Sequence, residues 1–228
     1  MPIFGKDSRV SAIIFHAPEI LTVLHRFGIY LEVGDMNVEE AAEKAGINPV
    51  FLLTMLNTYL NEDYFPEEAV KNFTISDIVE YLAKTDTYWI ESQLPNIDRH
   101  FHSLLSRSED SSNLSLLAEF YASMAKELTA RIHLDLDTVF PLLAEAEKSG
   151  KNVKDICPDL LAKIEDTSVE DKAGDLLTFF IVHLKGKYDS NLCRAVITTL
   201  FTLDKDIKQN NRIRTRILIQ LLKSRDLI

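Results

Sequence analysis

The part of this chain with the clearest potential for chemistry is a polar pair, His133 and Asp137, inside a long stretch of helical periodicity. Residues four apart lie on one face of an α-helix, so an imidazole and a carboxylate would point the same way. We expect that face to be the inward one, shared with Leu117, Met124 and Leu128. Burial of such a pair requires a metal ion, an opposite charge or a hydrogen-bond partner. The spacing alone fits either a satisfied core pair or metal ligands.

Polar residues interrupt the apolar stripes of three further helical stretches. Asp86 lies on an otherwise apolar face, His183 follows a pair of phenylalanines, and Asn210 and Arg214 lie four residues apart. Each has an ordinary explanation: Asp86 as an exposed acid, His183 as a core histidine bonded to a carbonyl group, and Arg214 as part of a solvated basic surface. They form a site only if the helices bring them together.

Composition and charge narrow the class of protein. The chain has 228 residues, of which 46% are hydrophobic and 26% charged, with only 7 Gly and 7 Pro, and this favours an all-α fold over a turn-rich β fold. The net charge of -10 repels nucleic acid and anionic membranes, so we expect neither as a partner. No apolar run approaches the ~18 residues of a membrane span, and no signal peptide is recognisable. We expect a cytoplasmic protein with reduced thiols at Cys157 and Cys193.

The periodicity predicts two parts. Short helices over 18–27, 38–45 and 49–60 form a small N-terminal domain, residues 1–65, which has nine acidic residues against four basic ones. That balance has the wrong sign for a DNA-reading helix-turn-helix. The pattern lapses before Pro66, and long helices over 76–106, 112–148, 168–187 and 189–224 then predict an antiparallel four-helix bundle, residues 74–228.

Several patterns in chain order resemble the repair-of-iron-centres family. They are residues 27–35 (FGIYLEVGD), 38–47 (VEEAAEKAGI), 85–95 (TDTYWIESQLP), 127–141 (ELTARIHLDLDTVFP), 182–183 (VH) and 206–218 (DIKQNNRIRTRIL). The resemblance implies a hemerythrin-like bundle with a di-iron centre of four histidines and two bridging glutamates. It also implies an N-terminal domain that pairs chains, and a role in iron–sulfur cluster repair and the response to nitric oxide and oxidative stress.

The departures from the family pattern fall on the metal ligands. The six ligand positions carry Asp86, His133, Asp137, His183, Asn210 and Arg214. Only two histidines are kept, and Arg214 stands where the second bridging glutamate is expected. A guanidinium is always charged and offers only donors, so we predict that an intact di-iron centre is absent. Glu32 and Val33 replace the family's paired cysteines.

Two interpretations follow. In the favoured one the protein is non-enzymatic and the site is metal-free: Arg214 bridges Asp86 and Asp137, while His133, His183 and Asn210 complete a buried network. In the alternative, His133, Asp137 and His183 hold one iron or zinc ion that senses or reacts with oxygen, peroxide or nitric oxide.

The apolar helices of the N-terminal domain lead to an expectation about assembly. The residues concerned are Ile13, Ile14, Phe15, Leu53 and Leu56. They are more than a unit of this size can bury alone, so we expect a homodimer through residues 1–65. A further protein partner is compatible with a non-enzymatic role.

Overall fold

The computed structural model describes residues 2–109 and 112–228. Within those ranges the chain is helical and contains no β-strand, only an isolated bridge between Arg9 and Asn37. The predicted all-α class is confirmed. The N-terminal helices are α1 (Val10–His16), a 3₁₀ turn (Pro18–Ile20), α2 (Leu21–Arg26), α3 (Val38–Lys44), α4 (Pro49–Leu60) and the short α5 (Glu67–Val70).

Four long helices follow in the described residues, and each contains one π-helical turn. The first joins α6 (Ile75–Tyr88) through Trp89–Gln93 to α7 (Leu94–Ser106), and the second joins α8 (Ser112–Leu134) through Asp135–Val139 to α9 (Phe140–Ser149). The third is α12 (Ser168–Thr178) ending in Phe179–His183, and the fourth joins α13 (Ser190–Arg212) through Ile213–Leu218 to α14 (Ile219–Ser224). The connector before the third helix carries α10 (Val153–Ile156) and α11 (Leu160–Glu165).

Local sequence signals explain how the small helices begin and end. Asn37 and Glu40 form a reciprocal capping box at the start of α3, with hydrogen bonds of 2.8 and 2.9 Å between each side chain and the other residue's backbone N–H. Gly28 and Gly46 follow α2 and α3 with φ of +71° and +70°, a conformation that glycine adopts at little cost. Both signals are visible in the sequence itself, as Asn37 with Glu40 three residues later and as a glycine just past each apolar run.

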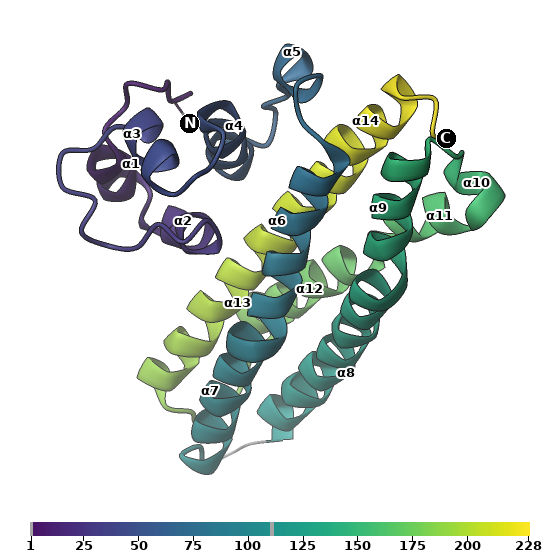
Figure 1. The fold of residues 1–228 in the computed structure, drawn as a ribbon. Coiled ribbons are helices and arrows are strands. Elements are labelled where there is room, and N and C mark those ends of the chain that lie inside the picture. Colours follow the sequence, from purple (N-terminus) through teal and green to yellow (C-terminus); the bar gives the residue numbers. More distant parts are fainter. Residues whose placement is uncertain (1, 110–111) are drawn as a thin grey trace.

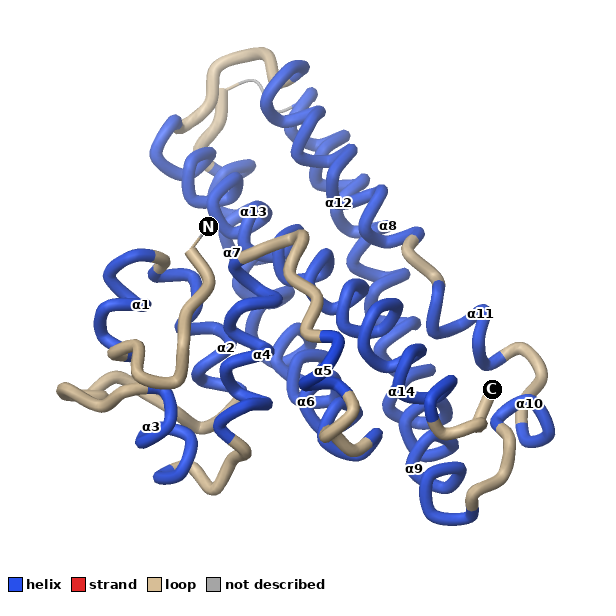
Figure 2. The backbone as a smooth tube through the Cα atoms, turned by 90° about the horizontal axis from the view of Figure 1, so that it is seen from above, coloured by secondary structure: helices blue, strands red, loops and turns tan. Residues whose placement is uncertain are grey.

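The long helices pack side by side as a bundle, and α1 to α4 lie together against one side of it (Figure 1). Of these small helices, α2 contacts α6 and α4 contacts α13. The view from above shows the same arrangement, with α10 and α11 at the end of the bundle where the chain terminates (Figure 2). We refer to residues 2–65 as the N-terminal unit.

The apolar core is divided into two clusters. One joins the N-terminal unit to one end of the bundle and includes Leu52 and Leu56 of α4 with Leu82 and Ile217 of the long helices. The other fills the opposite end, from Trp89 to residues near the start of α8 and α13. The N-terminal helices therefore share a core with the bundle, and a layer of polar side chains separates the two clusters.

None of the helices in the described residues combines the length and apolar character that crossing a membrane requires.

Candidate functional site

Charged and amide side chains gather at mid-bundle between the two apolar clusters. We call this set the buried polar layer; it comprises Arg26, Asp86, Arg131, Asp135, Asp206, Gln209, Asn210, Asn211 and Arg214. Each of them is at most 9% exposed. Buried charges are tolerated only when they are paired and hydrogen-bonded, so the contacts within the layer decide its stability.

Arg214 lies at the centre of the layer, in the π-helical turn of the fourth long helix, and is 1% exposed. Its Nη1 and Nη2 donate to the two carboxylate oxygens of Asp135 at 3.1 and 2.5 Å, and its Nε donates to Asn210 Oδ1 at 2.6 Å. The planar guanidinium also lies 5.5 Å from the ring centre of Phe140. The bidentate contact between Arg214 and Asp135 is among the strongest pairings that a carboxylate makes in proteins.

Asp86 is the least satisfied member of the layer. Its nearest cation is Arg214 Nη2, 3.7 Å from Oδ2, but neither carboxylate oxygen accepts a hydrogen bond from the described residues. Burial raises the pKa of Asp86 to about 7, and the positive charge of Arg214 only partly opposes this rise. Because the guanidinium is already bonded to Asp135, burial prevails and Asp86 releases its proton only around pH 7.

Arg131 extends the layer toward the third long helix. It donates from Nη2 to Asn211 Oδ1 at 2.7 Å, and Asn211 in turn donates to Glu170 Oε2 at 2.8 Å. Its Nε lies 3.8 Å from Asp135. Burial, helped by the nearby charge of Arg214, lowers the pKa of Arg131 to about 10. The Asp135 carboxylate therefore lies close to two arginines, Arg131 and Arg214.

Arg26 brings the N-terminal unit into the layer. It forms a buried ion pair with Asp206 of α13, and Trp89 Nε1 donates to the same carboxylate at 2.7 Å. Arg26 Nη1 also donates to the Tyr81 hydroxyl at 3.3 Å, which donates to Gln209 at 3.1 Å. Burial raises the pKa of Tyr81, so this phenol stays neutral and can donate. These contacts connect α2 with the first and the fourth long helices.

The structure brings together three of the six predicted site residues. Asp86, Asn210 and Arg214 meet in the layer, whereas His133 and Asp137 are exposed. The prediction that His133 and Asp137 face inward was wrong. His133 follows Leu128 by five residues, and at 100° per residue this turns it about 140° away from the inward stripe. That stripe passes through Ile132 to Asp135, so Asp135 replaces Asp137 as the partner of Arg214.

His183 is also exposed and lies far from His133. It stands at the end of the third long helix, with its ring 5.6 Å from that of Phe179, and borders a groove beside Leu117 near the start of α8. His133 lies at the other end of α8, sixteen residues beyond Leu117, or about 24 Å along the axis. The prediction that His133, Asp137 and His183 converge on one ion was therefore wrong.

The side chains that do converge do not fit the two irons that the resemblance implies. A guanidinium occupies the centre of the layer and is bonded to the carboxylate that a metal would need. No group of three His, Cys, Asp or Glu side chains in the described residues has the arrangement of a metal site. Arg214 already supplies the positive charge that neutralises Asp135, so the charge of this carboxylate is balanced within the protein itself.

Sequence reasoning missed Asp135, Arg131, Arg26 and Asp206. The phase of the apolar stripe could have revealed Asp135, because it lies three residues after Ile132. Asp206 likewise lies four residues before Asn210 on the same helix. Nothing in the sequence pattern linked Arg26 to a position 180 residues later.

Comparison of the chain with known family models, curated proteins and solved structures found no match in any of the three. The resemblance to the repair-of-iron-centres family stays a prediction that rests on the sequence patterns.

The raised pKa of Asp86 predicts a specific pH dependence of stability. The unfolded chain releases this proton near pH 3.8 and the folded chain near pH 7, so rising pH destabilises the folded state across that window. Relative to Asp86→Asn, wild type should lose about 2 to 3 kcal/mol of unfolding free energy between pH 5 and pH 8. Urea unfolding at several pH values measures this difference. Asp137→Asn, an exposed carboxylate on the second helix, is the control; if both variants follow the wild-type pH profile, Asp86 is not a buried protonated acid.

Proposed function

We propose that this chain is a non-enzymatic, hemerythrin-like protein in which a buried arginine takes the place of the di-iron centre. The observation that supports this most is the two-pronged contact between Arg214 and Asp135 at mid-bundle. The sequence resemblance assigns the position of Arg214 to a bridging glutamate. The positive charge that metals would supply comes here from the protein itself.

Electrostatics argue against a metal ion beside this arginine. A unit charge and a divalent ion a few ångströms apart repel each other by several kcal/mol at an intermediate dielectric constant. Asp86 is the only carboxylate near Arg214 without an accepted hydrogen bond in the described part of the chain, and below its pKa of about 7 it is largely protonated and so a poor ligand. The single-ion alternative requires His133 and His183 to share one ion, but His133 lies near the end of α8 whereas His183, on the third long helix, lies beside the start of α8.

The burial of the layer supports a structural role for it. Its members are almost entirely enclosed, so a substrate has no direct access to Arg214, Asp135 or Asp86. We propose that the protein acts through partners rather than through turnover. The role that the resemblance implies is in iron–sulfur cluster repair and the response to nitric oxide and oxidative stress.

Metal analysis tests this proposal. Protein purified anaerobically from iron-replete cells should contain well below one metal atom per chain, because Arg214 and Asp135 satisfy each other. Ferrous iron or a chelator should leave the thermal unfolding midpoint unchanged, since a ligand that binds only the folded state would raise it. Near-stoichiometric iron or zinc that is lost on Asp86→Ala or His133→Ala would contradict a metal-free site.

We also propose a homodimer formed through the N-terminal unit. Of the apolar residues that suggested it, Ile13 and Leu56 are buried within the chain and Ile14 and Leu53 are partly buried, whereas Phe15 is 88% exposed. Phe15 at the end of α1 is therefore the residue on which the proposed contact depends.

Light scattering provides the test of assembly. Wild type should show the mass of a dimer at tens of micromolar, and Phe15→Ser should shift it toward the monomer because a large exposed apolar side chain is removed from the contact. Leu116→Ser removes an exposed apolar residue at the other end of the bundle and should leave the mass unchanged. A monomer mass for wild type at every concentration would refute the dimer.

A further inference from the structure

An apolar groove lies between the start of α8 and the end of the third long helix. Its volume is about 360 Å³, within the range of sites that hold small molecules. The residues that line it are Asn113, Leu116, Leu117, Phe120, Phe179 and His183. Only Asn113 and His183 among them are polar. A mostly apolar lining with a few polar groups is the composition of a small-molecule site.

Large apolar side chains are exposed at this groove and beside it. Leu116 is 65% exposed and Phe179 is 43% exposed. Ile181 and Val182, in the same π-helical turn as Phe179, are exposed as well, and of the apolar residues of that turn Phe180 alone is buried. Neighbouring exposed apolar residues mark a binding surface, whereas single ones need no explanation. The turn that ends the third helix therefore presents apolar side chains to solvent.

Aromatic contacts and one hydrogen bond fix the walls of the groove. The Phe179 ring lies edge-on to the ring of Phe120, with centres 5.9 Å apart, and its centre is 5.6 Å from that of the His183 ring. Asn113 Oδ1 accepts a hydrogen bond of 3.2 Å from the backbone N–H of Lys185, which ties α8 to the chain just after the third helix. Because the walls are already held, a ligand loses little affinity to their ordering.

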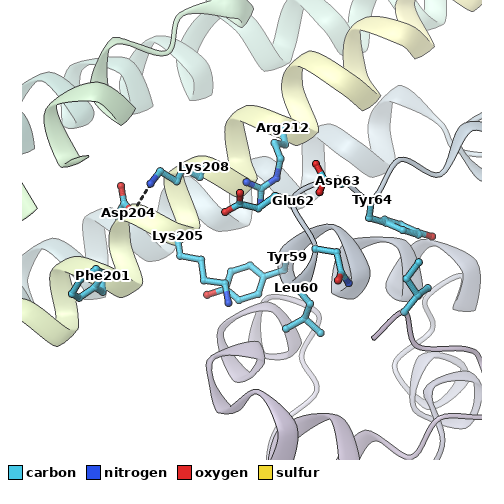
Figure 3. A pocket seen from close by; sticks show the side chains of 12 residues that line it. Tyr59, Leu60, Glu62, Asp63, Tyr64, Phe201, Asp204, Lys205, Lys208 and Arg212 are labelled. Carbon is cyan, nitrogen blue, oxygen red and sulfur yellow. Dashed lines mark hydrogen bonds and ion pairs between the residues drawn. The ribbon is translucent and has the colours of Figure 1, made fainter. Parts of the chain in front are cut away.

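Charge separates this apolar groove from a wider groove between the end of α4 and α13 (Figure 3). The wider groove is lined by three acids, Glu62, Asp63 and Asp204, and by three cations of α13, so its lining favours neither sign. One of those cations, Lys208, is bonded to Asp204 at 2.8 Å. No carboxylate lines the apolar groove among the described residues, although the chain has a net charge of -10. An anionic ligand therefore meets no like charge in its lining.

The polar groups at the apolar groove fit a carboxylate. His183 lines the groove, and Lys185 follows two residues later, with its backbone bonded to Asn113 and its side chain exposed. Imidazole and ammonium N–H groups form charge-assisted hydrogen bonds with carboxylates. A ligand with an apolar body and one carboxylate thus complements both the apolar lining and the polar groups next to it.

The size of the groove favours a small molecule over a protein partner. A specific protein–protein interface takes about 800 Å² and roughly 20 to 30 residues from each side. The few residues that line the groove fall far short of this, even with Ile181 and Val182 beside them. A single alkyl chain, by contrast, needs only a narrow apolar slot between two helices.

We propose that this groove binds a free fatty acid. The alkyl chain lies between Leu116, Phe120 and Phe179, and the carboxylate contacts His183 and Lys185. Leu117 precedes Asp135 by about 27 Å along the axis of the second long helix. The proposal therefore does not depend on the metal content of the buried polar layer.

Isothermal titration calorimetry with decanoate, kept below the concentration at which it forms micelles, tests the proposal. Wild type should bind one decanoate per chain saturably, and several-fold more tightly than octanoate because each buried methylene group adds to the affinity. Phe179→Ser should weaken binding about tenfold, since it removes one wall of the groove. Phe201→Ser removes a phenylalanine of similar exposure, 49%, from the wider groove and should bind like wild type.

Two further measurements keep the test decisive. Leu116 is so exposed that Leu116→Ser leaves the core intact, and this variant should also weaken binding several-fold even if Phe179→Ser fails to fold. Decanol has the same chain without the charge and should bind wild type about fivefold more weakly or worse.

The proposal is overturned if decanoate does not saturate wild type, or if Phe179→Ser and Leu116→Ser both bind it as well as Phe201→Ser does. Equal affinity for decanol would also overturn it, because the carboxylate would then contribute nothing. Vesicles of phosphatidylcholine and phosphatidylglycerol that bind wild type and are not displaced by decanoate would assign the apolar side chains to a membrane surface instead.

Discussion

The burial of one guanidinium at the centre of a helical bundle is the constraint on which the interior of this protein depends. Arg214 is 1% exposed and always charged, so it requires an anion at bonding distance. Asp135 provides that anion and Asn210 accepts a third hydrogen bond. With Arg214 bonded to Asp135, burial raises the pKa of the second nearby acid, Asp86, to about 7. The pairing therefore determines both the charge balance and the ionisation of its neighbours.

The other buried charges of the layer need partners for the same reason, and their contacts extend across the molecule. Asp135 lies beside Arg131, whose hydrogen bond to Asn211 continues to Glu170 on the third long helix. Arg26 of the N-terminal unit and Asp206 of α13 form a second buried ion pair. Polar contacts are directional where apolar packing is not, so the layer fixes the register of the helices between two apolar clusters. A homogeneous apolar core would leave that register less defined.

The fold was largely predictable from the sequence, and the site only in part. Apolar periodicity predicted the long helices, and Asn37 and Gly46 are recognisable sequence signals for the start and the end of α3. The partner of Arg214 was misassigned because the phase of one stripe was set by His133 instead of Ile132, an error of a single residue that rotates a side chain by about 100°. The π-helical turns and the bond from Arg26 to Asp206 arise from tertiary packing, which local pattern does not encode.

A double-mutant cycle on Arg214 and Asp135 tests the central pairing most directly. Arg214→Met and Asp135→Leu should each lower the unfolding free energy by about 3 to 5 kcal/mol, because each leaves a buried charge without its bidentate partner. The double variant should be more stable than the sum of the single effects predicts, with a coupling of about 2 kcal/mol or more, since both charges are then gone. Additive effects in urea unfolding would show that the two residues do not stabilise each other and would contradict the account.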